Sequence, residues 1–354
     1  MSFHILTLAE AGVRLSVDRG LLVCQWKDSN LTKTIPLDDV RLVVVQTPHA
    51  SFTQPALCAL LERNVIILHL NAKNKVVGYS VPLHQTLSPQ ALRGQVQSWN
   101  TPFQQETVWH AIKHQKLWNQ SHVLDLFKLE NKLQPKLEIG YADEAALARQ
   151  YWQQWFWATG GKTKTRERLG TMRFENKALN YAYAIIGGLT HQALLSYGLL
   201  PQLGVHHALK RVGTPLVWDL MEPLRPFVDL LVLQYLEAYP CSAEERLTDA
   251  YWKRFYQTFL VSLRSIRLAP KKPMYTLKLM DAPNAMARTL ARCFETQSVT
   301  GLWLPALPMA YWHTDSTTEG FFQPRWFESG LRCQQSPRTT LADDGDDDEA
   351  DWPF

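Results

Sequence analysis

Polar and apolar residues alternate with a period of two along the first part of the chain. Residues 13–18 (VRLSVD) show this pattern, residues 18–20 (DRG) supply a turn, and the alternation resumes over residues 22–26. A period of two is typical of a strand with one buried face. Two short apolar runs, residues 40–45 and 65–70, predict further strands.

One helix interrupts this strand-rich region. Thr53 is a suitable N-cap, because its hydroxyl can accept a hydrogen bond from a free N–H group of the first turn. Pro55 is tolerated in that turn, and residues 56–62 carry the apolar face. Residues 1–84 are therefore predicted to form a small β-rich, β-sandwich-like domain.

In the second part of the chain the spacing of the apolar residues becomes helical. Residues 85–135 are rich in Gln, Leu, Lys and Trp, and helical patterns continue to about residue 300. One helix is expected to end near Gly198, and another is expected to run from Asp219 to Tyr239.

The predicted fold class is α+β with two domains, in which a small N-terminal β-rich domain precedes a larger all-α C-terminal domain. We expect an irregular aromatic and Pro-rich wrap at the end of the helical domain. The expected boundaries are residues 1–84 for the first domain, 85–100 for a linker, 101–335 for the helical domain and 336–354 for an acidic, disordered tail.

The formal net charge of +4 is the sum of two unlike parts. Seven acidic residues lie in residues 343–351, and residues 343–354 contain no Lys or Arg. The preceding 342 residues carry 37 basic and 26 acidic side chains, a net charge of +11. A basic body with an acidic tail favours a protein that binds a polyanion.

Cysteine use and hydropathy exclude several classes of protein. The five cysteines are widely spaced and form no Cys-x-x-Cys pair, which argues against a disulfide scaffold and a thiolate zinc site. The N-terminus has no secretory-signal pattern, and no uncharged apolar stretch reaches the roughly 18–20 residues that span a bilayer. We therefore expect a cytoplasmic protein that does not enter a membrane.

Acidic and histidine side chains in the helical part could carry chemistry. Glu144 lies two helical turns before Tyr151, so both share one helix face. His206 and His207 are adjacent, so at most one is expected to face a given site. Taken singly, a helical Glu is most often a solvated charge, and a His is most often a loop or core residue.

Four charged residues fall within one apolar segment, DLMEPLRPFVD. Asp219 and Glu222 are spaced i, i+3 and share a helix face. Burying such charges is costly unless they pair or hold a metal, and we expect an ion pair between Arg225 and Asp229. Two carboxylates and one imidazole form a donor set that suits Mg²⁺ or Mn²⁺.

A basic run could contact DNA phosphates. Two glycines and several threonines accompany it and add hydrogen-bond donors. A solvated loop is the alternative interpretation of the same run. Its members are Lys162, Lys164, Arg166, Arg168, Arg173 and Lys177.

Together these segments resemble the CRISPR-associated integrase and endonuclease of spacer acquisition, the first-numbered Cas protein family. The resemblance covers most of the chain and rests on the order and spacing of its motifs. These are LRGQ (residues 92–95), the Glu144 segment, NKALNYAYAII (176–186), GLLPQLGVHH (198–207) and DLMEPLRPFVD (219–229). The chain departs from the family where Ala145 replaces a common Gly and in its acidic C-terminal extension.

The resemblance implies a metal site on the helical, catalytic domain. Its ligands would be Glu144, His207 and Glu222, holding Mg²⁺ or Mn²⁺, with Asp219 as a further acid that contributes through a water. The metal would activate the attacking 3′-OH, or water in hydrolysis, at the scissile phosphate. Asn180, Arg225 and Asp229 are expected to be structural, with Arg225 orienting Glu222 or Asp229.

The resemblance also implies an assembly and a reaction. The N-terminal domain would mediate a homodimer, and two dimers would flank a central dimer of a small ferredoxin-like partner, the second-numbered Cas protein, in a heterohexamer. This complex would capture a short double-stranded DNA. Each exposed 3′-OH would then join the CRISPR array by transesterification at an end of the first repeat.

Three alternatives stay open at this point. The chain could be a non-catalytic DNA-binding scaffold, in which the acids only brace the fold. It could be a mobile-element integrase outside CRISPR, with the same chemistry on other DNA ends. It could also be an unrelated metal hydrolase built on His206 and His207, although that interpretation leaves the Glu144 segment and the basic body unexplained.

We expect the acidic tail to weaken non-specific DNA binding, as a DNA mimic or a partner-docking arm. Deleting residues 341–354 should therefore raise the affinity for random duplex DNA at low salt, because the tail no longer competes for the basic body. A fluorescence-anisotropy titration of both proteins measures this change. Unchanged affinity would show that the tail is only a solvated end.

Overall fold

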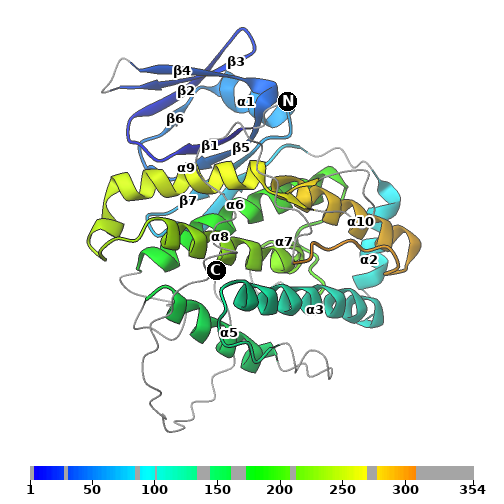
Figure 1. The fold of residues 1–354 in the computed structure, drawn as a ribbon. Coiled ribbons are helices and arrows are strands. Elements are labelled where there is room, and N and C mark those ends of the chain that lie inside the picture. The colour runs from blue at the N-terminus through cyan, green and yellow to red at the C-terminus, as the bar shows by residue number, and fades with distance from the viewer. Residues whose placement is uncertain are drawn as a thin grey trace.

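A β-rich N-terminal domain and a larger helical part make up the molecule, as predicted (Figure 1). The β-rich domain forms one end, and helices α3 and α5 lie at the opposite end. The computed structural model describes residues 4–27, 31–83, 88–99, 102–133, 144–160, 173–207, 213–268 and 277–307.

The N-terminal domain contains two four-stranded sheets and one helix. The first sheet has the order β1-β5-β7-β8, in which β8 alone runs antiparallel to its neighbour, and the second has the order β4-β3-β2-β6. The elements are β1 (His4–Leu8), β2 (Val13–Asp18), β3 (Leu21–Trp26), β4 (Thr32–Pro36), β5 (Val40–Val45), β6 (Ser51–Phe52), α1 (Gln54–Glu62), β7 (Ile66–Leu70) and β8 (Val76–Ser80).

The central strands of the first sheet are buried on both faces, which explains the largely apolar runs that predicted β5 and β7. Successive side chains of a strand point to opposite faces. Val43 and Ile67 therefore face the second sheet, in a core shared with α1, whereas Leu42 and Leu68 belong to the core of the helical part. The two domains consequently share the first sheet as a common wall.

Local signals in this domain are confirmed by the backbone. Arg19 and Gly20 have φ values of 45° and 81°, and positive φ at both central residues is the signature of a type I′ hairpin turn. The hydroxyl of Thr53 accepts a hydrogen bond of 3.4 Å from the N–H of Ala56, as expected of an N-cap.

The rest of the described chain is largely helical, and none of the helices in the described ranges could span a membrane. The elements are α2 (Pro89–Trp99), α3 (Pro102–Leu126), α5 (Glu144–Ala158), α6 (Phe174–Ser196), α7 (Pro215–Met221), the 3-10 turn η2 (Glu222–Leu224), α8 (Arg225–Ala238), α9 (Asp249–Ser265), β9 (Arg267–Leu268), β10 (Leu277–Lys278) and α10 (Ala282–Thr296).

The helical part differs from the expectation in three places. The segment expected as a linker contains the packed helix α2. The expected all-α domain contains a short antiparallel pair, β9 and β10, because Ile266 turns the chain into extended backbone after α9. The helix expected from Asp219 to Tyr239 is divided into α7, η2 and α8. Its two internal prolines, Pro223 and Pro226, lack the N–H groups that a continuous helix needs.

The chain beyond α10 packs along α3 as far as it is described. The indole N–H of Trp118 donates to the carbonyl of Leu307 at 3.1 Å, and Asn119 donates to the carbonyl of Pro305 at 2.9 Å. These bonds agree with the predicted irregular wrap over residues 300–307. The rest of the predicted wrap and the acidic tail lie outside the described residues.

Gly94 lies where helix α2 crosses close to helix α10, so a substitution at this position tests how tightly the two helices pack. A Cβ at this position would lie 2.1 Å from the carbonyl oxygen of Phe294 in α10. Ala is favoured over Gly by up to about 1 kcal/mol in an unconstrained helix. We nevertheless expect Gly94→Ala to lower the free energy of unfolding, by about 1–3 kcal/mol, because the two backbones must separate.

Denaturant unfolding measures the effect, and Gly78→Ala in β8 is the control, because a Cβ there meets nothing within 4 Å. Equal or greater stability of Gly94→Ala would show that the crossing can relax without cost.

Candidate functional site

The acids and the histidine predicted as a site come from separate segments that meet near the 3-10 turn η2. Helices α3 and α5 lie below α7 and α8 in Figure 1, on the side away from the β-rich domain. Glu144 is the first residue of α5, Asp219 lies in α7, and Glu222 begins η2. His207 lies in the loop between α6 and α7.

The 3-10 turn exists because Pro223 has no N–H for the carbonyl of Asp219. That carbonyl accepts from the N–H of Glu222 instead, which tightens the backbone by one residue. The side-chain amide of Asn119 in α3 donates to the carbonyl of Pro223 at 2.8 Å. The turn is thereby attached to α3, and Glu222, only 3% exposed, faces that helix.

Two cations neutralise the buried carboxylate of Glu222. Arg225 Nε lies 3.1 Å from Oε1, and Lys116 Nζ lies 2.8 Å from Oε2. Burial alone would raise the pKa of Glu222, but the charges of Arg225 and Lys116 outweigh burial and hold the pKa at about 2. Among the described residues, Oε2 has no aligned hydrogen-bond donor, so Lys116 contacts it only as an ion.

Lys116 bridges the two carboxylates that were predicted as metal ligands. Its ammonium donates a 2.8 Å hydrogen bond to Glu144 Oε1 while it contacts Glu222, and its side chain is 14% exposed. Burial favours the neutral amine, but the carboxylates of Glu222 and Glu144 outweigh it and raise the pKa of Lys116. Lys116 is therefore charged, and it lies between Glu144 and Glu222.

Asp219 orients His207 and is not free to bind a metal. Its fully buried carboxylate accepts from the backbone N–H groups of Val205, His206 and His207, and from His207 Nδ1 at 2.5 Å. With Nδ1 protonated for this bond, the lone pair of the imidazole is on Nε2. Four donors saturate Asp219, so the structure gives it a positioning role in place of the expected role as a water-linked ligand.

Two other residues hold the loop of His207 in place. A Cβ on Gly204 would lie 2.7 Å from Asp219 Oδ2, so only Gly permits the loop to approach that carboxylate. Gln95, from the LRGQ motif of α2, donates to the carbonyls of Leu200 and Leu203 and accepts from the N–H of Leu200. The motif thus anchors the loop from the opposite side.

The two adjacent histidines have different surroundings, as expected from their spacing. His206 stacks on Trp109 of α3 with a centroid distance of 4.1 Å and an interplanar angle of 3°. Burial, together with the neighbouring His207, lowers the pKa of His206. His207 bonds Asp219 and keeps 37% of its side chain exposed, so a ligand can reach it while Asp219 fixes its orientation.

Two tyrosines hold the carboxylate of Asp229, and the ion pair that Arg225 forms in the structure is with Glu222. The hydroxyl of Tyr151 donates to the Asp229 carboxylate at 2.7 Å, and that of Tyr183 donates to the other oxygen. Arg225 pairs with Glu222 and lies over the ring of Tyr183 at 5.1 Å. Burial and the Asp229 charge raise the pKa of Tyr151 well above its usual value, so Tyr151 keeps its proton and donates it to this hydrogen bond.

Most of the predicted DNA-binding residues fall outside the described part of the chain. These are Lys162, Lys164, Arg166 and Arg168. Arg173 is exposed at the N-cap of α6, and Lys177 is half-buried one turn later. Asn180, expected to be structural, is half-buried on the same helix.

The oxygen and nitrogen donors of the site are of a kind that binds a divalent cation, although the ammonium of Lys116 lies between the carboxylates of Glu144 and Glu222. Within the described ranges, no group of three or more His, Cys, Asp and Glu side chains has metal-ligand spacing. Two carboxylates, a free imidazole Nε2 and the unaligned oxygen Oε2 of Glu222 are nevertheless oxygen and nitrogen donors of the kind that Mg²⁺ or Mn²⁺ accepts. Lys116 occupies the space between the carboxylates.

Sequence reasoning missed the contribution of α3. Trp109, Lys116 and Asn119 lie seven and then three residues apart, so they share one face of this helix. They contact His206, the two carboxylates and η2, respectively. The spacing was readable, but polar residues within α3 carry no local sign of partners from distant segments.

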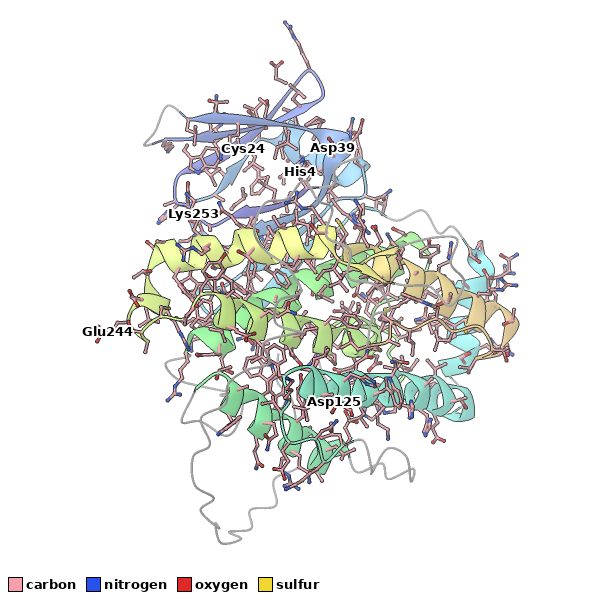
Figure 2. The ribbon with its side chains drawn as sticks, viewed as in Figure 1. His4, Cys24, Asp39, Asp125, Glu244 and Lys253 are labelled. Carbon is pink, nitrogen blue, oxygen red and sulfur yellow. The ribbon has the colours of Figure 1, made fainter. Side chains whose placement is uncertain are left out.

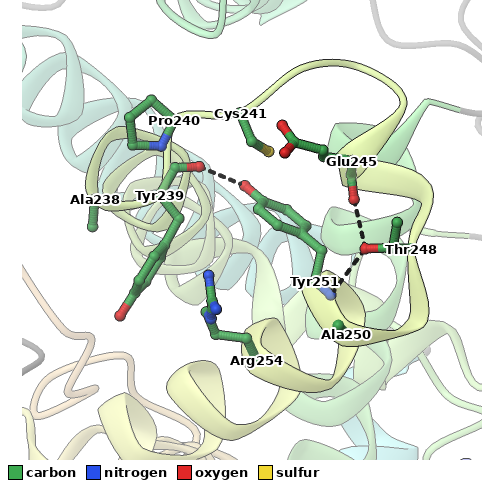
Figure 3. A pocket seen from close by; sticks show the side chains of 9 residues that line it. All are labelled: Ala238, Tyr239, Pro240, Cys241, Glu245, Thr248, Ala250, Tyr251 and Arg254. Atoms are coloured by element: carbon green, nitrogen blue, oxygen red, sulfur yellow. Dashed lines mark hydrogen bonds between the residues drawn. The ribbon is translucent and has the colours of Figure 1, made fainter.

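A pocket of about 470 Å³ lies elsewhere, between the end of α8 and the start of α9 (Figure 3). Its polar groups contact one another. The hydroxyl of Tyr251 donates to the carbonyl of Tyr239 at 3.0 Å, and Arg254 lies over the ring of Tyr239. This pocket contains none of the predicted site residues, so we assign the chemistry to the carboxylate site.

Comparisons with known proteins show the family and the fold of the chain. A sequence model described as "CRISPR associated protein Cas1" matches residues 6–142 and 141–259. A protein of Neisseria meningitidis serogroup C (strain 8013), named CRISPR-associated endonuclease Cas1, is 29% identical over 246 residues, which are 67% of this chain and 77% of the relative.

Two solved structures have a similar fold. A casposase bound to an integration product matches with a TM-score of 0.72 and 17% identity, over 86% of this chain and 94% of the other. A chain of a Cas6-RT-Cas1–Cas2 complex matches with a TM-score of 0.66 and 18% identity, over 86% of this chain and 36% of the other. At these identities the likeness concerns the fold.

The depressed pKa of Glu222 predicts how stability depends on pH. A carboxyl whose pKa falls from 4.5 to about 2 on folding stabilises the protein above pH 4.5, and this contribution is lost as pH falls toward 2. The stability difference between wild type and Glu222→Gln should therefore shrink by about 1 kcal/mol per pH unit below pH 4.5. Urea unfolding of both proteins, from about pH 7 to about pH 3.5, measures it. A constant difference would contradict the ion-paired state of Glu222.

Proposed function

Because the chain belongs to the CRISPR-associated Cas1 family, we propose that it is a divalent-metal-dependent DNA endonuclease and integrase of CRISPR adaptation. The observation that carries the proposal is that Glu144 and Glu222 meet at a common cation, Lys116, with His207 near enough to help lower the pKa of Glu222. The Neisseria relative is named an endonuclease, and the casposase of similar fold is bound to an integration product, which supports the same chemistry.

Each site residue would have a distinct task in the proposed reaction. Glu144, His207 and Glu222 would hold Mg²⁺ or Mn²⁺, which supplies charge neutralisation at the scissile phosphate and acidifies the attacking 3′-OH or water. Asp219 accepts from His207 Nδ1, which would leave Nε2 with the lone pair for a metal. Arg225 keeps Glu222 ionised and fixes its direction.

DNA would be held mainly through its phosphates. The basic body and the basic run from Lys162 to Lys177 would contact the backbone, as would Arg173 at the exposed start of α6. Phosphate contacts carry no base information, so sequence choice by this chain should be weak and binding should decline steeply with salt.

The partners follow from the same family membership. One of the structures with a similar fold is a complex that contains both Cas1 and Cas2. We propose that this chain forms a homodimer through its β-rich domain, binds a small ferredoxin-like Cas2 protein in a heterohexamer, and acts in the cytoplasm on prespacer and leader-repeat DNA.

Strand transfer of a short duplex into a supercoiled plasmid that carries the array tests the proposal. Glu144→Gln, His207→Ala and Glu222→Gln should retain duplex binding and lose strand transfer in Mg²⁺ or Mn²⁺, by about a hundredfold or more, because a ligand is removed without changing the DNA-binding surface. Glu244→Gln is the matched control, since Glu244 is exposed at a distant corner of the helical part (Figure 2).

The competing functions predict different results in the same assay. A non-catalytic scaffold gives no product, and its DNA binding is insensitive to EDTA. A mobile-element integrase transfers strands equally well into a plasmid without the array. Full activity of any of the three ligand variants would contradict the assignment of the site.

A further inference from the structure

Lys116 lies where a metal bound by Glu144 and Glu222 would lie. Its Nζ is 2.8 Å from an oxygen of each carboxylate, so the two oxygens are separated by at most twice that distance. A divalent ion bound by both would have to lie between them, at about 2.0–2.6 Å from each. A metal held by these two oxygens would therefore occupy the volume that the ammonium fills.

We propose that Lys116 is a built-in counter-cation that closes the site in the metal-free protein and must be displaced for a metal to bind. The inference rests on the proposed metal site, but it concerns a residue that the proposed reaction does not use. An ammonium and a divalent metal in the same small volume would repel each other strongly, because the dielectric constant is low there. The ammonium and the metal therefore exclude each other from the site.

Helix α3 keeps the ammonium in this position. Asn119, three residues after Lys116, is fully buried and ties α3 to η2 and to the chain after α10 through three hydrogen bonds. These bonds hold the helix backbone against η2, so the displacement is proposed for the side chain of Lys116 alone. Lys has a flexible four-carbon stem, which permits such a displacement without a change of fold.

The contact geometry indicates that Lys116 can be released. Its bond to Glu144 is aligned, and Glu144 is 30% exposed, so solvent can replace that partner. Its contact with Glu222 Oε2 lacks hydrogen-bond alignment. Glu222 also keeps a second cation, Arg225, and therefore does not become an isolated buried charge when Lys116 leaves.

Lys116 would have two opposing effects. Without metal it stabilises the fold, because it offsets the repulsion between Glu144 and Glu222. With metal it competes, so it raises the metal concentration that the site needs. A purely structural lysine would show the first effect without the second.

Mn²⁺ binding to the full-length, DNA-free protein tests this inference by electron paramagnetic resonance of the free ion. Lys116→Met keeps the length and apolar stem of the side chain and removes its charge. We expect it to bind Mn²⁺ on the order of tenfold more tightly than wild type, or more. Its melting temperature should be lower without metal and should rise more on addition of Mn²⁺.

Lys253→Met is the matched control. Lys253 also pairs with a carboxylate, Glu10 at 3.1 Å, but it lies on α9 beside the β-rich domain and its side chain is 66% exposed (Figure 2). It should bind Mn²⁺ like wild type. Adding Glu222→Gln to Lys116→Met should abolish the gain, which locates the extra affinity at this site.

Equal or weaker Mn²⁺ binding by Lys116→Met overturns the inference, even if the wild type performs metal-dependent strand transfer. Tighter binding supports it, even if no strand transfer is found and the proposed function fails. If Lys116→Met does not fold without metal, Lys116→Gln, which can still donate to the carboxylates, allows the same comparison.

Discussion

Three buried carboxylates within eleven residues impose the arrangement of the helical part. Asp219, Glu222 and Asp229 are at most 3% exposed, and a buried charge without partners is strongly destabilising. Each one draws its partners from different segments: the loop at 205–207 for Asp219, α3 and the start of α8 for Glu222, and α5 and α6 for Asp229. Satisfying these charges therefore brings the site segments together.

The partners of each carboxylate also determine what it can do. Asp219 accepts four hydrogen bonds, so its lone pairs are used and it can only position His207. Asp229 is held by two tyrosines and serves to attach α5, which carries Glu144 two turns before Tyr151. Of the three, Glu222 is neutralised by two ion pairs, with Lys116 and Arg225, and in the described part of the chain its Oε2 has no hydrogen bond, which suits the metal-binding role proposed for it.

Local sequence patterns correctly predicted those features that depend on residues close together in the chain. Alternation and turn residues located the strands around residues 18–20, and Thr53 located the start of α1. The order of strands β1, β5 and β7 depends on parallel pairing across long connections, which no local pattern encodes. The break in the helix after Asp219 was readable from Pro223, whereas no local pattern indicated that tyrosines from α5 and α6 would hold Asp229.

The contribution of Lys116 could not be read from the sequence for a related reason. Its partners are 28 and 106 residues away, and they reach it only because Asn119 attaches α3 to a 3-10 turn created by a proline. An internal cation at this place lets the carboxylates be buried and brought together before any metal is present. On the proposed exchange, folding and metal binding would be separate steps, since the ammonium would neutralise the acids during folding and a divalent ion would replace it afterwards. A site built without such a lysine would depend on metal for the stability of its own fold.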